Sequence, residues 1–102
     1  MRLLNRHIDY GKRADLLKAL AHPVRLQIVH DLLKNGCRNV RCMEIHIGMS
    51  QSCISQHLQK LRLAGVVSAE RSGNEVYYRV ASSCVERLME AWMSEEADAH
   101  VV

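Results

Sequence analysis

The sequence predicts a mainly α-helical fold with one small β-hairpin, which places the chain in the α+β class. Three observations lead to this class. Apolar residues recur at helical spacing from about residue 14 to residue 65, β-forming residues then flank a short turn, and an amphipathic helix follows. The 102 residues, of which 48% are hydrophobic and 25% charged, have the size and composition expected of a single domain over residues 1–102.

Two helices are expected within residues 14–38. The first runs to about Leu20, and the amphipathic stretch before Ala14 either extends it or forms a short helix of its own. Pro23 suits the first turn of the second helix, because a missing N–H costs little there, and Gly36 suits its end. The apolar stripe of the second helix consists of Val24, Ile28, Val29 and Leu32.

Residues 39–65 predict two short helices around a tight turn at Gly48. Ser50 can cap the second of these helices, and Gly65 can end it. The expected inner faces are Val40, Met43 and Ile47 in the first helix and Ile54, Leu58 and Leu61 in the second. This spacing is the helix-turn-helix pattern, in which residues 51–64 form the recognition helix.

Residues 66–80 predict a β-hairpin, because valines and tyrosines flank the turn residues Ser72, Gly73 and Asn74. A last helix is expected over residues 81–99. Its apolar stripe consists of Val85, Leu88, Met89 and Trp92. The order of helices, helix-turn-helix, hairpin and final helix predicts a winged helix-turn-helix, with the hairpin as the wing.

Charge is divided unevenly along the chain, whose formal net charge is +3. Residues 1–80 carry 13 Lys and Arg against 6 acids, a net charge of +7, and residues 81–102 carry one Arg against 5 acids, a net charge of −4. The basic part contains the helix-turn-helix, which favours a polyanion as partner. The polar N-terminus and the absence of a long apolar run predict a cytoplasmic protein without a membrane segment, in which cysteines are thiols.

Three segments resemble the ArsR/SmtB family of winged-helix repressors. LKALAHPVRLQIV is similar to the family's opening motif, IGMSQSCISQHLQKLRLAGVV to its recognition helix and GNEVYYRV to its second wing strand, so the match covers roughly residues 14–92. The resemblance implies a homodimer that packs through its first and last helices and binds an inverted repeat in double-stranded operator DNA. Within the family the chain most resembles members that lack obvious metal sites.

The polar face of the recognition helix is expected to contact DNA, with glutamine reading adenine edges and serine contacting base or phosphate. The expected contacts are Ser50, Gln51, Ser52, Ser55, Gln56 and Gln59. Lys60, Arg62, Arg71 and Arg79 are expected to contact phosphates, and Asn74 lies with Arg71 beside the wing turn. His57, at the edge of the apolar stripe, is expected to be half-buried scaffolding. The alternative is a merely solvated polar face.

The metal sites typical of the family are incomplete in this sequence. Cys42 stands alone where arsenic-sensing relatives carry a pair of cysteines. The zinc-sensing pattern falls on Ser82, Cys84, Glu95 and Asp98, a poor ligand set. No metal and no cofactor are therefore expected, and a metal- or metalloid-responsive repressor remains an alternative.

The cysteines offer thiol chemistry in place of metal chemistry. Cys37 and Cys84 occupy the two regions from which thiol-sensing relatives draw a reactive pair, so they are the main candidates for a thiol switch. Cys42 and Cys53 are weaker candidates, and inert cysteines are the alternative. Cys53 is expected to fill the place of a threonine, unless His57 makes it oxidisable.

The stripe of the last helix predicts the dimer interface, at Leu88, Met89 and Trp92. A thiol enzyme is the rival from another class, but the sequence has no oxyanion-hole motif, so no enzymatic activity is expected. A winged-helix module that only contacts proteins, or one without an inducer, is a further alternative.

Overall fold

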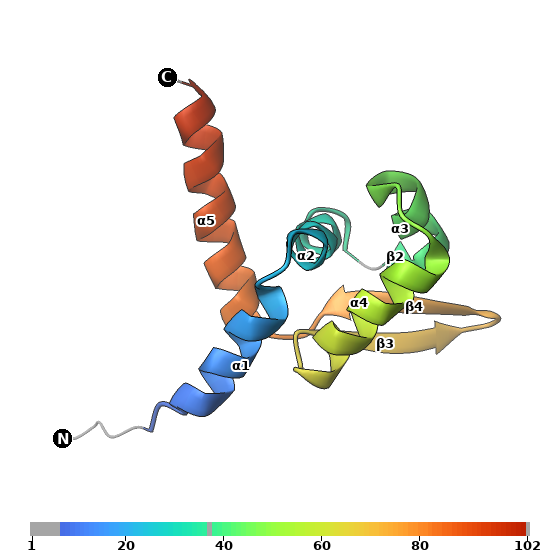
Figure 1. Cartoon of the computed structure of the whole chain (residues 1–102), viewed down its shortest axis with the longest axis horizontal. Coiled ribbons are helices and arrows are strands. Elements are labelled where there is room, and N and C mark those ends of the chain that lie inside the picture. The colour runs from blue at the N-terminus through green and yellow to red at the C-terminus, as the bar shows by residue number, and fades with distance from the viewer. Residues whose placement is uncertain (1–6, 37, 102) are drawn as a thin grey trace.

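The computed structural model describes residues 7–36 and 38–101, with side chains up to Ser94. Within these residues, five helices and three strands follow one another (Figure 1). In order these are α1 (Tyr10–Leu20), α2 (Pro23–Asn35), β2 (Arg38–Asn39), α3 (Val40–Ile47), α4 (Gln51–Leu63), β3 (Val67–Ser72), β4 (Glu75–Val80) and α5 (Ser83–Val101). The predicted α+β class with its winged helix-turn-helix is confirmed.

Capping residues set the ends of the first two helices. The Asp9 carboxylate accepts the backbone N–H of Lys12 at 3.0 Å, so α1 begins at Tyr10, before the expected Ala14. Ile8 precedes this helix, and the earlier part of the amphipathic stretch lies outside the described residues. Pro23 opens α2 as predicted, and the Nδ1 atom of His22 accepts the N–H of Val24 at 3.1 Å. Gly36, with φ of 79°, ends α2.

The wing belongs to a three-stranded antiparallel sheet of order β2-β4-β3, whereas the sequence predicts only a hairpin. Strands β3 and β4 pair from Val67 opposite Val80 to Ser72 opposite Glu75. Strand β2 adds two residues, with Asn39 opposite Tyr77. A strand of two residues is too short to show alternation in a sequence, so it could not be predicted.

One apolar core joins all five helices to the base of the sheet. The inner face of α4, the most regular of the predicted stripes, is fully buried: Ile54, Leu58 and Leu61. The described residues contain no helix with both the length and the apolar character needed to cross a membrane. In Figure 1, α1 and α5 lie together at the side opposite the tip of the wing, and the distal part of α5 extends beyond the other elements.

The apolar stripe of α5 is divided between two surroundings. Val85 and Met89 are 1% and 0% exposed because they pack into the core of their own chain. Leu88 and Trp92 are 41% and 50% exposed. The prediction that Met89 lies between subunits is therefore wrong, since a residue four positions after Val85 shares its inward face.

Candidate nucleic-acid interface

A three-residue turn fixes α4 against α3. Gly48 ends α3 in the left-handed conformation, with φ of 79° and ψ of 31°, and donates its N–H to the Glu44 carbonyl at 2.8 Å. A side chain at this backbone conformation would be strained, which explains the glycine. The Ser50 Oγ atom then accepts the N–H of Cys53 at 3.2 Å and caps α4 as predicted.

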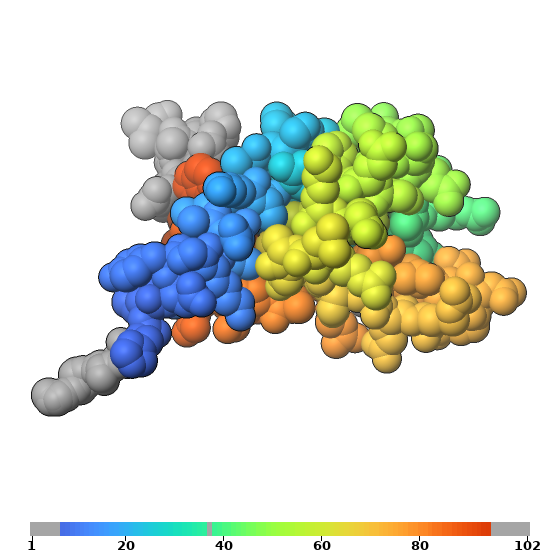
Figure 2. All heavy atoms as spheres, turned by 60° about the horizontal axis from the view of Figure 1, so that its bottom comes forward, coloured from blue at the N-terminus to red at the C-terminus, as the bar shows by residue number. Residues whose placement is uncertain are grey.

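The outer face of α4 is polar and open to solvent. All six residues predicted to read DNA are exposed: Ser50, Gln51, Ser52, Ser55, Gln56 and Gln59. Figure 2 shows α4 crossing the middle of one face of the molecule, between α1 and the wing. Because the opposite face of the helix is buried in the core, the polar side chains are presented on a firmly anchored helix.

Cationic and polar side chains border this helix. Lys60 and Arg62 are exposed in the last turn of α4, and Arg71 is exposed in β3. Asn74 is exposed in the wing turn, next to Gly73. The structure thus places the predicted phosphate contacts at the end of α4 and in the wing.

His57 joins α4 to the start of α2. Its ring is half-buried, as predicted, and lies 4.5 Å from the ring of His22 between centroids. The Nη1 atom of Arg25 lies 3.4 Å from the Nδ1 atom of His57. Burial lowers the pKa of His57 below its usual value, and His22, Arg25 and Lys60 lower it further.

The sequence did not identify Arg25 and His22 as neighbours of α4. Arg25 also donates to the Ala19 carbonyl, so its guanidinium links α1, α2 and α4. The contact with His57 joins residues 32 positions apart in the chain. Periodicity and capping patterns carry no information on such distant pairs, and no local signal could have found this one.

The three described cysteines lie apart from this polar face or at its edge. The Cys84 Sγ atom, at the start of α5, accepts a hydrogen bond from the Nη1 atom of Arg13 in α1 at 2.9 Å. Cys42 and Cys53 are half-buried in α3 and α4. Cys37 lies outside the described residues, so its pairing with Cys84 stays a prediction. No group of three or more potential ligands gathers as a metal site among the side chains that the structure describes.

Comparison with known proteins agrees with this geometry. The model of the arsR family of bacterial regulatory proteins matches residues 22–69, which include α2, α3 and α4. The transcriptional repressor PagR of Bacillus anthracis is 41% identical over 76 residues, which are 74% of this chain and 76% of PagR. The nodulation protein NolR of Rhizobium meliloti is 37% identical over 86 residues, which are 84% of this chain and 70% of NolR.

Solved structures show the same fold. The crystal structure of PagR superposes with a TM-score of 0.77 at 37% identity, covering 81% of this chain and 94% of PagR. The homodimeric winged helix-turn-helix DNA-binding domain of a Mycobacterium bovis protein gives a TM-score of 0.75 at 40% identity, covering 90% of this chain and 83% of that domain. The chain belongs to the ArsR/SmtB family of DNA-binding transcriptional repressors, and its fold is the winged helix-turn-helix.

Proposed function

We propose that the protein represses transcription in the cytoplasm as a homodimer bound to an inverted repeat in operator DNA. One observation carries this proposal: a capped helix of 13 residues, buried along one face, presents an unbroken row of serine and glutamine side chains on the other. At about 1.5 Å per residue such a helix is roughly 20 Å long, which suits insertion into the major groove.

Base reading and backbone contact are assigned to different residues. Gln56 and Gln59 lie one turn apart on the exposed face, and each amide can donate to and accept from an adenine edge. Lys60 and Arg62 at the end of α4, with Arg71 and Asn74 in the wing, are assigned to the sugar-phosphate backbone. The cations supply affinity that depends on salt, and the glutamines supply sequence preference.

The surface of α1 and α5 supports dimerisation. Leu17, Leu88 and Trp92 are 56%, 41% and 50% exposed. Large apolar side chains that are exposed together mark a surface that contacts another protein. A hollow of about 230 Å³ between the two helices is lined by Leu16, Leu17, Leu20, Val85, Leu88, Arg13 and Cys84. We assign this face to a second copy, because a two-fold axis lets the same apolar residues cover one another. The homodimeric relative from Mycobacterium bovis has the same fold.

Release of the operator is assigned to modification of Cys84, with Cys37 as its proposed partner thiol. Cys84 is half-buried, accepts a hydrogen bond from the Arg13 cation and lines a pocket of about 510 Å³ between α1 and α5. Reactive cysteines occupy electropositive, partly accessible surroundings of this kind. Cys84 also lies beside the proposed dimer face, so added bulk there would alter the spacing of the two recognition helices.

A gel shift with duplex DNA from upstream of the protein's own gene tests the function. The proposal predicts that one segment with an inverted repeat binds the wild-type protein about a thousandfold or more tighter than random duplex, which is the usual margin between specific and non-specific binding. Binding no better than to random DNA would refute it and favour a module that contacts only proteins.

Titration with peroxide separates the thiol assignments. Release of operator should persist in Cys53→Ser and be lost in the double variant Cys37→Ser/Cys84→Ser. Loss of the response in Cys53→Ser alone would instead assign the switch to α4.

A further inference from the structure

A polar pocket lies between the wing and the helix-turn-helix. It has a volume of about 390 Å³, and its lining includes Asn39, Arg41, Gln51, Asn74 and Glu75. Gln51 begins the recognition helix and Asn74 lies in the wing turn, so this pocket separates two proposed DNA contacts. The contacts that set the width of this pocket therefore also set the distance between the wing and α4.

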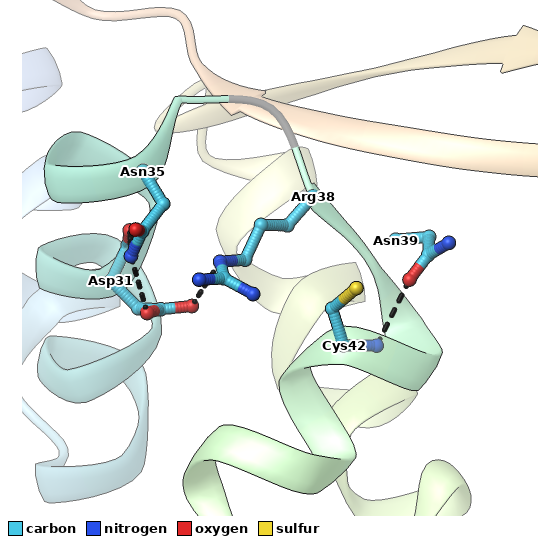
Figure 3. A network of polar contacts seen from close by, with 5 residues as sticks. All are labelled: Asp31, Asn35, Arg38, Asn39 and Cys42. Atoms are coloured by element: carbon cyan, nitrogen blue, oxygen red, sulfur yellow. Dashed lines mark hydrogen bonds and ion pairs between the residues drawn. The ribbon is translucent and has the colours of Figure 1, made fainter.

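Asn39 is bonded to both sides of the pocket through its side-chain amide. Its Oδ1 atom accepts the backbone N–H of Cys42 at 2.9 Å and caps α3 (Figure 3). Its Nδ2 atom donates to the Oε1 atom of Glu75, the first residue of β4, at 2.8 Å. The backbone adds a third tie, because Asn39 pairs with Tyr77 across the sheet.

The residue before Asn39 is anchored to α2. The Nε atom of Arg38 lies 3.0 Å from the Oδ2 atom of Asp31, an ion pair whose angles are not those of a hydrogen bond. The Nδ2 atom of Asn35 donates to the other oxygen of Asp31 at 3.0 Å. Figure 3 shows these three side chains and Asn39 along one path from the end of α2 to the start of α3. Glu75 is therefore bonded to a residue whose neighbour is anchored in the body of the protein.

We infer that Asn39 and Glu75 are positioning residues for DNA binding, which hold the wing at the distance from α4 that lets both contact the operator. The inference rests on the proposed function. Neither residue needs to touch DNA for this role. The amide of Asn39 is suited to it because one side chain can accept from the helix and donate to the wing at once.

An exchange of donor and acceptor tests the bond. Asn39→Asp keeps the cap of α3, because aspartate and asparagine cap helices about equally, but it sets a carboxylate against the carboxylate of Glu75. Combined with Asn39→Asp, the substitution Glu75→Gln gives the wing an amide N–H that can donate to the new carboxylate at position 39. The hydrogen bond is then restored with donor and acceptor exchanged. Gln27→Glu is the matched control, since it makes the same change from amide to carboxylate at an exposed position of α2 that belongs neither to this network nor to the lining of the pocket.

Fluorescence anisotropy with the operator duplex found in the gel shift measures the outcome. Asn39→Asp should bind about three- to tenfold more weakly than Gln27→Glu, as expected for loss of a partly exposed polar contact with added repulsion, while the melting temperature of Asn39→Asp stays close to that of the wild type. Glu75→Gln should then raise affinity about threefold more in the Asn39→Asp background than in the wild type, where it only removes a charge.

Two results would overturn the inference. The first is an Asn39→Asp variant that binds operator as tightly as Gln27→Glu. The second is an equal gain in operator affinity from Glu75→Gln in the wild type and in Asn39→Asp. Such a result would mean that this substitution acts only by removing a negative charge. A wild-type protein that binds no operator would instead remove the proposed function, and with it this inference.

Discussion

Replacing Leu88 by glutamate should convert the protein from dimer to monomer without unfolding it. Leu88 is 41% exposed on α5 and lines the apolar hollow between α1 and α5, so its outer part is free to meet a second copy. Full burial of a leucine contributes about 1.5–3 kcal/mol, and the exposed share corresponds to roughly 0.6–1.2 kcal/mol in each subunit. Because a two-fold interface contains Leu88 from both subunits, this contribution enters the free energy of dimerisation twice.

The introduced carboxylate adds a larger cost, because two charges would have to be desolvated at the interface. Together these effects should raise the dissociation constant of the dimer about a hundredfold or more, since every 1.4 kcal/mol is a factor of about ten. Sedimentation velocity across a series of protein concentrations measures the change. Circular dichroism of the same samples should show unaltered helix content.

Leu63→Glu is the matched control. Leu63 is 78% exposed at the end of α4, is not among the residues that line the apolar hollow between α1 and α5, and receives the same substitution. It should leave the dimer intact. A wild-type protein that sediments as a monomer at micromolar concentration, or a Leu88→Glu variant that dimerises as well as Leu63→Glu, would show that this face of α5 is not the interface.

Three further predictions concern α4 and the wing. Gln56→Ala should weaken operator binding by about 1–3 kcal/mol in anisotropy titrations and leave binding to random duplex nearly unchanged, because base contacts carry specificity. Arg71→Ala should weaken binding to both duplexes alike and reduce the slope of log K against log salt by about one. The free energy of unfolding in urea should fall as the pH falls through 6.5, since burial and the neighbouring His22 lower the pKa of His57 below that value and the unfolded chain binds the proton first. His57→Gln should lose this part of the pH dependence, and an unchanged profile would mean that His57 is not its source.

Short-range signals in the sequence were sufficient for most of the fold. Ser50 and Gly48 predicted where the helix-turn-helix bends, because a cap and a left-handed glycine act on residues within one turn of themselves. Periodicity predicted the buried face of α4 equally well. The same reasoning leaves the start of α1 open, at Ala14 or earlier, because the cap at Asp9 lies before the regular apolar repeat that begins near Ala14.

Contacts between distant residues could not be predicted in the same way. Arg13 meets Cys84 across 71 positions, and Asn39 meets Glu75 across 36. The sequence predicts Met89 in the dimer interface because periodicity shows that a helix face is apolar, but not whether its own chain or a second copy covers that face. These pairings depend on how the elements pack, which no local pattern records.

Hydroxyl-radical footprinting of the DNA upstream of the protein's own gene tests whether a dimer reads its operator through α4. If two copies of α4 enter successive major grooves, the wild-type protein should protect two half-sites of an inverted repeat whose centres lie about 10 base pairs apart or a multiple of that spacing. Gln56→Ala should need more protein to give the same pattern. A footprint on one half-site only, or uniform protection without a preferred position, would contradict a dimer that reads its operator through α4.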